Sequence, residues 1–223
     1  MEKTVNVQTT GRYQIIGDLS KSTRGIWFVF HGYGMRSEDF VKSFECIEDE
    51  QTVIVAPEGL HRFYSKSTRG SVAANWMTKE LRESDISNNV IYLNTIWEDL
   101  LTQGMPEAVK LGVLGFSQGG PTSMRWASQM NRDVNEMVIW GSDLPLDVVD
   151  DIHKLKKVNQ SNLKIMVGSD DQYISSERVD ELIMEMHGKG VDFDFHTFEG
   201  KHELHEDSIR YFHARLMDEK TEY

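Results

Sequence analysis

A serine flanked by glycines is the first feature of the sequence that points to chemistry. Ser117 lies in Gly115-Phe116-Ser117-Gln118-Gly119, which matches the pattern G-x-S-x-G. In this pattern the serine occupies a sharp turn between a strand and a helix, where side chains two residues away on either side would collide with the returning backbone. Glycine at 115 and 119 avoids that collision. The pattern therefore predicts a nucleophilic hydroxyl raised above the end of a strand.

A serine nucleophile of this kind needs a carboxylate and then a histidine later in the chain. Asp171 follows an apolar segment and lies 54 residues after Ser117, and His202 lies a further 31 residues on, directly after Gly200-Lys201. Both are predicted at the carboxyl ends of strands, where open α/β sheets place their reactive groups. The order Ser117, Asp171, His202 predicts a catalytic triad.

The residues alone leave alternatives for two members of this triad. Asp170 is adjacent to Asp171, and Asp143 follows the preceding apolar segment, which is another place for the acid. His205 lies three residues after His202 and competes with it as the base.

A second predicted strand end supplies hydrogen-bond donors for a developing oxyanion. His31-Gly32-Tyr33-Gly34 follows the apolar run at residues 26–30, and the glycines allow the backbone to turn its amides toward a site. The predicted donors are the backbone N–H groups of Tyr33 and Gln118. His31 is predicted to bind nearby backbone rather than act as a base.

Aromatic residues near these segments are candidates for binding the substrate. Phe116, Trp76 and Tyr173 are the predicted substrate-binding residues, with Phe63 and Leu144 as further candidates; ordinary packing is the alternative for each. Residues 57–82 are predicted to form a long irregular segment that covers the site as a minimal cap, because such segments in compact domains are often functional.

The elements that must position these residues alternate along the chain. Continuous apolar runs predict strands buried on both faces of a parallel sheet, and they lie at residues 26–30, 53–56, 111–116, 137–140 and 163–167. Apolar residues at helical spacing between Ile86 and Leu100, Val179 and Met186, and Ile209 and Leu216 predict intervening helices. Residues 4–10 and 12–16 are predicted as polar edge strands, and residues 191–196 as a late strand with one exposed face. The fold class is α/β, with a mostly parallel central sheet and helices on both faces.

These motifs together resemble the α/β-hydrolase superfamily, and within it the small phospholipase/carboxylesterase group that includes acyl-protein thioesterases. The matching residues are His31-Gly32-Tyr33-Gly34, Gly115 to Gly120, Gly168-x-x-Asp171-x-x-Ile174 and Gly200-Lys201-His202. In that group the acid is the fourth residue of a G-x-x-D-x-x-V/I pattern, which favours Asp171. The sequence departs from the thioesterases around Trp76, where only the tryptophan is kept, and at Pro121, where they usually have alanine.

The resemblance implies one α/β-hydrolase domain over residues 1–223 and a serine hydrolase that cleaves carboxylic esters or thioesters without a metal or organic cofactor. Two other classes remain open. One is a peptidase or dienelactone-type hydrolase; the first often has an extra domain, and the second uses cysteine where this chain has Ser117. The other is a non-catalytic binding protein, although such relatives usually lack a triad member.

Composition limits the partners. Twenty-four basic and 36 acidic residues give a net charge of −12, which disfavours nucleic acid and anionic membranes. The expected partner is a small-molecule ester or thioester, and neutral or cationic esters are expected to suit this charge better than polyanionic ones. The N-terminal residues lack the apolar stretch of a signal peptide, and no window of the sequence predicts a transmembrane helix. Cys46 is the single cysteine, so no internal disulfide can form. A cytoplasmic protein is therefore expected.

Overall fold

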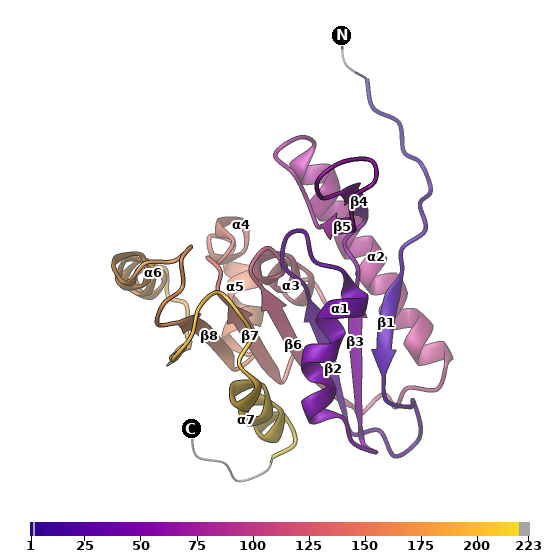
Figure 1. The fold of residues 1–223 in the computed structure, drawn as a ribbon. Helices are drawn as coiled ribbons and strands as arrows, with labels where there is room; N and C mark the ends of the chain where they lie inside the picture. Colours follow the sequence, from indigo (N-terminus) through magenta and orange to yellow (C-terminus); the bar gives the residue numbers. More distant parts are fainter. Residues whose placement is uncertain (2, 219–223) are drawn as a thin grey trace.

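A seven-stranded sheet forms the centre of the computed structural model, which describes residue 1 and residues 3–218 (Figure 1). The strand order is β1-β3-β2-β6-β7-β8-β9, and only β1 is antiparallel to its neighbour. The strands are β1 (Tyr13–Ile16), β2 (Gly25–Phe30), β3 (Thr52–Pro57), β6 (Lys110–Phe116), β7 (Glu136–Trp140), β8 (Leu163–Gly168) and β9 (Asp194–Phe198). The predicted mostly parallel α/β sheet is confirmed.

Helices cover both faces of this sheet. In Figure 1, α1 and α7 lie on the near face, whereas α2, α3 and α5 lie on the far face. The helices are α1 (Ser37–Phe40), the 3-10 helix η1 (Val41–Ile47), α2 (Arg82–Thr102), α3 (Gly119–Ala127), α4 (Leu146–Val149), α5 (Ile152–Asn159), α6 (Ser176–Gly188) and α7 (Glu206–Leu216). None of the helices in the described part of the chain is long and apolar enough to cross a membrane.

The two-sided cover explains why the strands are continuously apolar. Along β2, Phe28 and Phe30 enter the core beneath α2 and α3, and Trp27 and Val29 enter the core beneath η1 and α7. Successive side chains of a strand point to opposite faces, so both sets must be apolar when both faces are buried. The order of the strands places β6, which ends at Phe116 directly before Ser117, in the middle of the sheet.

Two strand predictions and one prediction of irregular structure are corrected by the structure. Residues 4–10 form no strand, because this segment has no partner strand and no apolar face to bury; Val5 and Val7 are exposed. Residues 57–82 are not irregular throughout: β4 (His61–Tyr64) and β5 (Val72–Asn75) pair as an antiparallel hairpin. The late strand begins at Asp194 rather than at residue 191, and it ends at Phe198.

A buried carboxyl group at the start of β7 gives the fold a pH dependence. The side chain of Glu136 is 2% exposed, accepts a hydrogen bond from Asn162, and lies near Lys164 and Arg215. Burial raises its pKa from 4.5 to about 7 despite these positive neighbours. Between these two values the folded chain therefore holds a proton that the unfolded chain has released, and stability falls as the pH rises.

We expect Glu136 to lower the free energy of unfolding by up to about 3 kcal/mol between about pH 5 and pH 8. Urea unfolding of the wild type and of Glu136→Gln across this range measures the effect. In the variant the free energy of unfolding should depend much less on pH, because glutamine cannot titrate. An equal pH dependence in the two proteins would contradict the prediction.

Candidate active site

Ser117 lies in a strained turn between β6 and α3. It is not glycine, yet its φ is +51°, a left-handed conformation that costs an L-residue roughly 1–2 kcal/mol. Its N–H donates to the carbonyl of Trp140 at 2.8 Å, which joins the turn to the end of β7. A Cβ atom on Gly115 would lie 2.3 Å from the Ser123 hydroxyl, and one on Gly119 would lie 2.3 Å from the Phe30 carbonyl oxygen. The turn therefore requires both glycines.

Asp171 and His202 form a buried pair. The His202 Nδ1 lies 2.7 Å from the Asp171 Oδ2, and the two side chains are 10% and 1% exposed. The other carboxylate oxygen accepts the N–H groups of Tyr173 at 2.8 Å and Ile174 at 3.1 Å. An ionised carboxylate only accepts hydrogen bonds, so Nδ1 carries the imidazole proton and Nε2 is left to accept another.

Glycines bring the loops after β7, β8 and β9 close enough to form this pair. The N–H of Asp170 donates to the Gly200 carbonyl at 2.8 Å. A Cβ on Gly168 would lie 2.4 Å from the Lys201 carbonyl oxygen, and one on Gly141 would lie 2.9 Å from the His202 ring. Sequence analysis did not assign a role to Gly141; its position directly after an apolar strand was the available signal.

The imidazole of His202 lies against the turn that contains Ser117. Its ring centroid is 4.8 Å from that of Phe116, the residue before the serine. Gly141, which contacts the same imidazole, directly follows the Trp140 carbonyl that binds the Ser117 N–H. The structure thus gathers Ser117, Asp171 and His202 at the carboxyl ends of parallel strands.

The competing residues have other partners. Asp143 forms an ion pair with Arg178 at 2.9 Å, and Asp170 is exposed. His205 directly precedes α7 and contacts the Ser208 hydroxyl at 2.9 Å. Among the predicted acids, Asp171 is the one that contacts His202.

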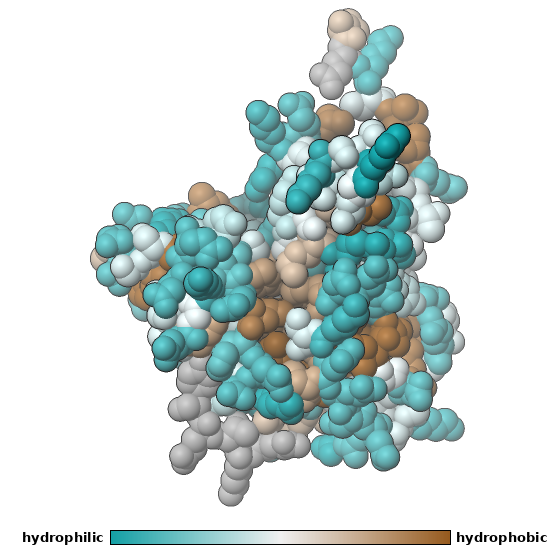
Figure 2. All heavy atoms as spheres, in the orientation of Figure 1, coloured by the Kyte–Doolittle hydropathy of each residue, from teal (hydrophilic) through white to brown (hydrophobic). Residues whose placement is uncertain are grey.

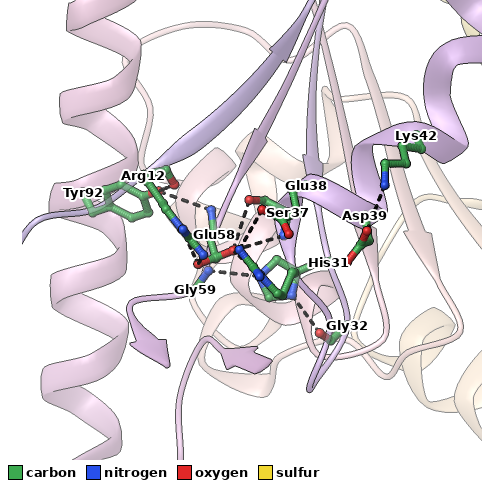
Figure 3. A network of polar contacts seen from close by, with 11 residues as sticks. Arg12, His31, Gly32, Ser37, Glu38, Asp39, Lys42, Glu58, Gly59 and Tyr92 are labelled. Atoms are coloured by element: carbon green, nitrogen blue, oxygen red, sulfur yellow. Dashed lines mark hydrogen bonds and ion pairs between the residues drawn. The ribbon is translucent and has the colours of Figure 1, made fainter. Parts of the chain in front are cut away.

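The loop after β2 is held by the ring of His31 (Figure 3). Its Nε2 accepts the N–H of Gly59 at 3.0 Å, so the proton lies on Nδ1, which donates to the Gly32 carbonyl at 2.8 Å. Burial lowers the pKa of His31 and keeps the ring neutral. This arrangement fits the predicted backbone-binding role of His31.

Glu58, which follows β3, holds the next part of the same loop (Figure 3). Its carboxylate is 1% exposed, forms an ion pair with Arg12 at 2.6 Å, and accepts the N–H and hydroxyl of Ser37 at 3.3 Å. Burial opposes ionisation, but the hydrogen bonds and charges of Arg12 and its neighbours outweigh it and lower the pKa of Glu58. Sequence analysis did not find this residue, because its partners lie far away in the chain.

Trp76 supports the same loop. Its ring is fully buried and stacks on His31 at 4.9 Å, and its indole N–H donates to the His31 carbonyl at 2.8 Å. The ring therefore has no exposed surface in this structure, and substrate binding by Trp76 stays a prediction. The Gln118 side chain accepts the Trp76 N–H at 3.0 Å and donates to the Met77 carbonyl at 2.9 Å, which joins the serine turn to the base of the β4–β5 hairpin.

The backbone N–H groups of Tyr33 and Gln118 both lie at this edge, and neither donates to an acceptor among the described residues. Their segments pack together, since a Cβ on Gly32 would lie 3.1 Å from the Phe116 ring. Gly34 has a φ of +75° and donates its N–H to the Ala74 carbonyl at 2.8 Å. The Tyr33 amide therefore belongs to a loop fixed on both sides.

Of the other predicted substrate-binding residues, Tyr173 is the most accessible. It is 74% exposed, and its ring meets that of His202 edge-on at 4.7 Å. Phe116 is 5% exposed and Leu144 4%. Phe63 of β4 packs on the exposed ring of Tyr33 at 5.5 Å.

A model of the dienelactone hydrolase family matches residues 31–215, a range that includes every residue of the predicted triad and the loop after β2. The chain belongs to the dienelactone hydrolase family. Family membership makes it a hydrolase of the α/β-hydrolase fold. The expectation that Ser117 argues against this family is wrong, because the match includes the serine turn.

Solved structures support the fold of this family member. Acyl-protein thioesterase 2 of Zea mays is 14% identical, with a TM-score of 0.68 over 93% of this chain and 100% of that one. Esterase PE8 is 15% identical, with a TM-score of 0.67 over 94% and 99% of the two chains. The Bacillus cereus carboxylesterase is 13% identical, with a TM-score of 0.62 over 93% and 94%. No curated protein sequence matches this hydrolase at a significant level.

Proposed function

We propose that this hydrolase cleaves carboxylic esters or thioesters through Ser117, His202 and Asp171 and an acyl-enzyme intermediate. The observation that carries the proposal is the 2.7 Å contact of His202 Nδ1 with Asp171, beside the strained turn of Ser117. This contact leaves Nε2 as the proton acceptor on the side of the ring away from the carboxylate.

The reaction proceeds in two halves. His202 takes the proton of Ser117 as its oxygen attacks the carbonyl carbon, and then gives that proton to the leaving alcohol or thiol. Water, activated by the same imidazole, attacks the acyl-serine and releases the acid. Asp171 holds the proton on Nδ1 and stabilises the imidazolium that forms in each half.

The free N–H groups of Tyr33 and Gln118 serve as the oxyanion donors. Losing one such donor typically costs about 3 kcal/mol of barrier, a factor of 10² to 10³ in rate. His31, Glu58 and Trp76 act through the loop of Tyr33 and are positioning residues.

A cyclic ester is the second candidate substrate, and the family match favours it. Attack on a lactone by Ser117 uses the same groups, but the leaving alcohol stays attached to the acyl chain. The acyl-enzyme then carries a free hydroxyl and is hydrolysed as before. Hydrolysis of a lactone and of its open-chain ester of equal carbon number compares the two candidates.

A substrate panel tests the function. We expect the wild-type protein to hydrolyse 4-nitrophenyl esters of some acyl length and to be labelled by a fluorophosphonate, which reacts with activated serines. The panel should include one thioester. Inactivity on every ester, thioester and lactone together with an absence of labelling would contradict the proposal and favour a binding protein.

A further inference from the structure

The β4–β5 hairpin is basic in a chain that is otherwise acidic. Residues 61–75, from the start of β4 to the end of β5, contain three Lys or Arg residues and no Asp or Glu, a formal charge of +3, whereas the whole chain carries −12. The three cations are Arg62, Lys66 and Arg69, and all three residues are exposed. In Figure 2, hydrophilic side chains cover the part of the surface where the hairpin lies.

These cations have no carboxylate partner among the described residues. Arg62 donates to the Thr10 carbonyl at 3.5 Å, and the carboxylate contact that the hairpin does make is that of the His61 ring with Asp85, at 3.0 Å. By contrast, Arg36, directly before α1, and Arg178 of α6 are paired with Glu38 and Asp143. The positive charge of the hairpin is therefore not neutralised locally.

The hairpin is attached to the site on the side of the proposed oxyanion donors. Its β5 strand accepts the Gly34 N–H through Ala74, and Phe63 packs on Tyr33 at 5.5 Å. Lys66 lies two residues past the end of β4, at most about 10 Å from Phe63 at a strand rise of about 3.3 Å per residue. The hairpin cations therefore lie on the side of the site where the proposed oxyanion donors lie.

The opposite side of the site is acidic. The loops near His202 expose Asp170, Glu199 and Glu203, with Lys201 as the one cation between them. In the sheet, β2 and β3 lie on one side of β6, and β8 and β9 on the other, so the hairpin and these loops flank Ser117 from two sides. The charge across the site therefore runs from positive at the hairpin to negative at the His202 loop.

We propose that the hairpin selects esters whose carbonyl is joined through a spacer to an anionic group, a carboxylate or a phosphate. The inference rests on the proposed ester hydrolysis. Salt screens charges beyond about 8–10 Å at physiological ionic strength, so the hairpin and not the remote acidic surface sets the potential at this side of the site. Such a local field raises the rate of capture by 10- to 10³-fold at low salt. The net charge of −12 by itself predicts the opposite preference.

Pairs of esters test this selectivity. Each pair has a 4-nitrophenyl monoester of a dicarboxylic acid of four, six, eight or ten carbons and the same compound with its free carboxylate capped as a methyl ester. We expect kcat/KM for the anionic member to exceed that of the neutral member by about tenfold or more at about 20 mM salt, most strongly for the longer spacers. The ratio should approach one at about 0.5 M salt. A matching series carries a terminal phosphate in place of the carboxylate. If the anionic-to-neutral ratio of kcat/KM is larger in this series, phosphate is the preferred anionic group; if it is not, carboxylate is.

Two matched variants locate the effect. The triple variant R62Q/K66Q/R69Q should reduce the ratio to within about twofold of one, whereas K21Q/R24Q/K156Q removes three exposed cations elsewhere and should leave it unchanged. Thermal unfolding of both variants establishes that they fold. A wild-type ratio of one or less at every length, or an equal fall in both variants, would overturn the proposal while the neutral esters were still hydrolysed. If neither member of any pair is hydrolysed, the proposed function fails, and this inference falls with it.

Discussion

Replacing Ser117 with alanine is expected to lower kcat for ester hydrolysis by at least about 10⁴-fold, because the variant has no oxygen to form the acyl-enzyme. Residual activity would come from water attacking a carbonyl held by the amides of Tyr33 and Gln118. Labelling by a fluorophosphonate should disappear altogether, since the probe forms its bond to the same oxygen. Single-turnover kinetics and labelling of the purified variant measure both effects.

The matched control for this variant is Ser123→Ala. Ser123 lies six residues later on α3 and donates its hydroxyl to the Gly120 carbonyl at 2.8 Å. Its replacement removes a serine hydroxyl close to the same turn and should leave labelling intact. Labelling that persisted in Ser117→Ala would reject Ser117 as the nucleophile.

Ser117→Ala should also fold as well as the wild type. Alanine at this position still has the φ of +51°, so the strain of the turn is unchanged. The N–H that binds the Trp140 carbonyl is backbone and remains. The expected thermal midpoint is within a few degrees of the wild-type value, which separates loss of chemistry from loss of structure.

The central sheet and the serine turn were predictable because their causes are local in the sequence. A strand buried on both faces must be apolar at every position, so runs such as residues 26–30 and 111–116 identify themselves. The glycines at 115 and 119 are fixed by contacts within a few residues or with the adjacent strand. Asp171 and His202 follow from the order of strand ends, and the family pattern favours Asp171, but it is their contact in the structure that pairs them and leaves out Asp170 and His205.

The sequence does not predict the β4–β5 hairpin, because β4 is mostly exposed and β5 is a four-residue run whose buried members are the small residues Ala73, Ala74 and Asn75. Neither a long apolar run nor a clean alternation marks these strands. For Trp76, the sequence gives a large aromatic residue near a site no direction. Its actual partners, His31 and Gln118, are 45 and 42 residues away.

Net charge is silent on local arrangement for a related reason. A sum over the chain cannot show that three cations share one hairpin beside the site while acidic groups lie on the other side. Because screening limits each charge to its surroundings, the arrangement near Ser117 matters more for a substrate than the total.

Replacing Asp171 with asparagine is expected to lower kcat by about 10⁴-fold at neutral pH while the fold is kept. The reason lies in the hydrogen bonds around the carboxylate. One oxygen accepts the N–H groups of Tyr173 and Ile174, and the asparagine carbonyl must take this place to satisfy both donors. The amide NH₂ then faces His202 Nδ1, which must give up its proton to accept a hydrogen bond. The proton moves to Nε2, and that nitrogen can no longer accept the proton of Ser117.

Asp170→Asn and Asp143→Asn are the matched controls for this change. Each removes one carboxylate near the site. Asp170 is exposed, Asp143 forms an ion pair with Arg178, and neither carboxylate contacts His202. Both should keep kcat within about threefold of the wild type, because they leave the imidazole proton on Nδ1. A large loss in either control together with a near-normal rate for Asp171→Asn would transfer the role of the acid to that residue. The tautomer, rather than the summed negative charge near His202, is therefore the property that this set of three variants isolates.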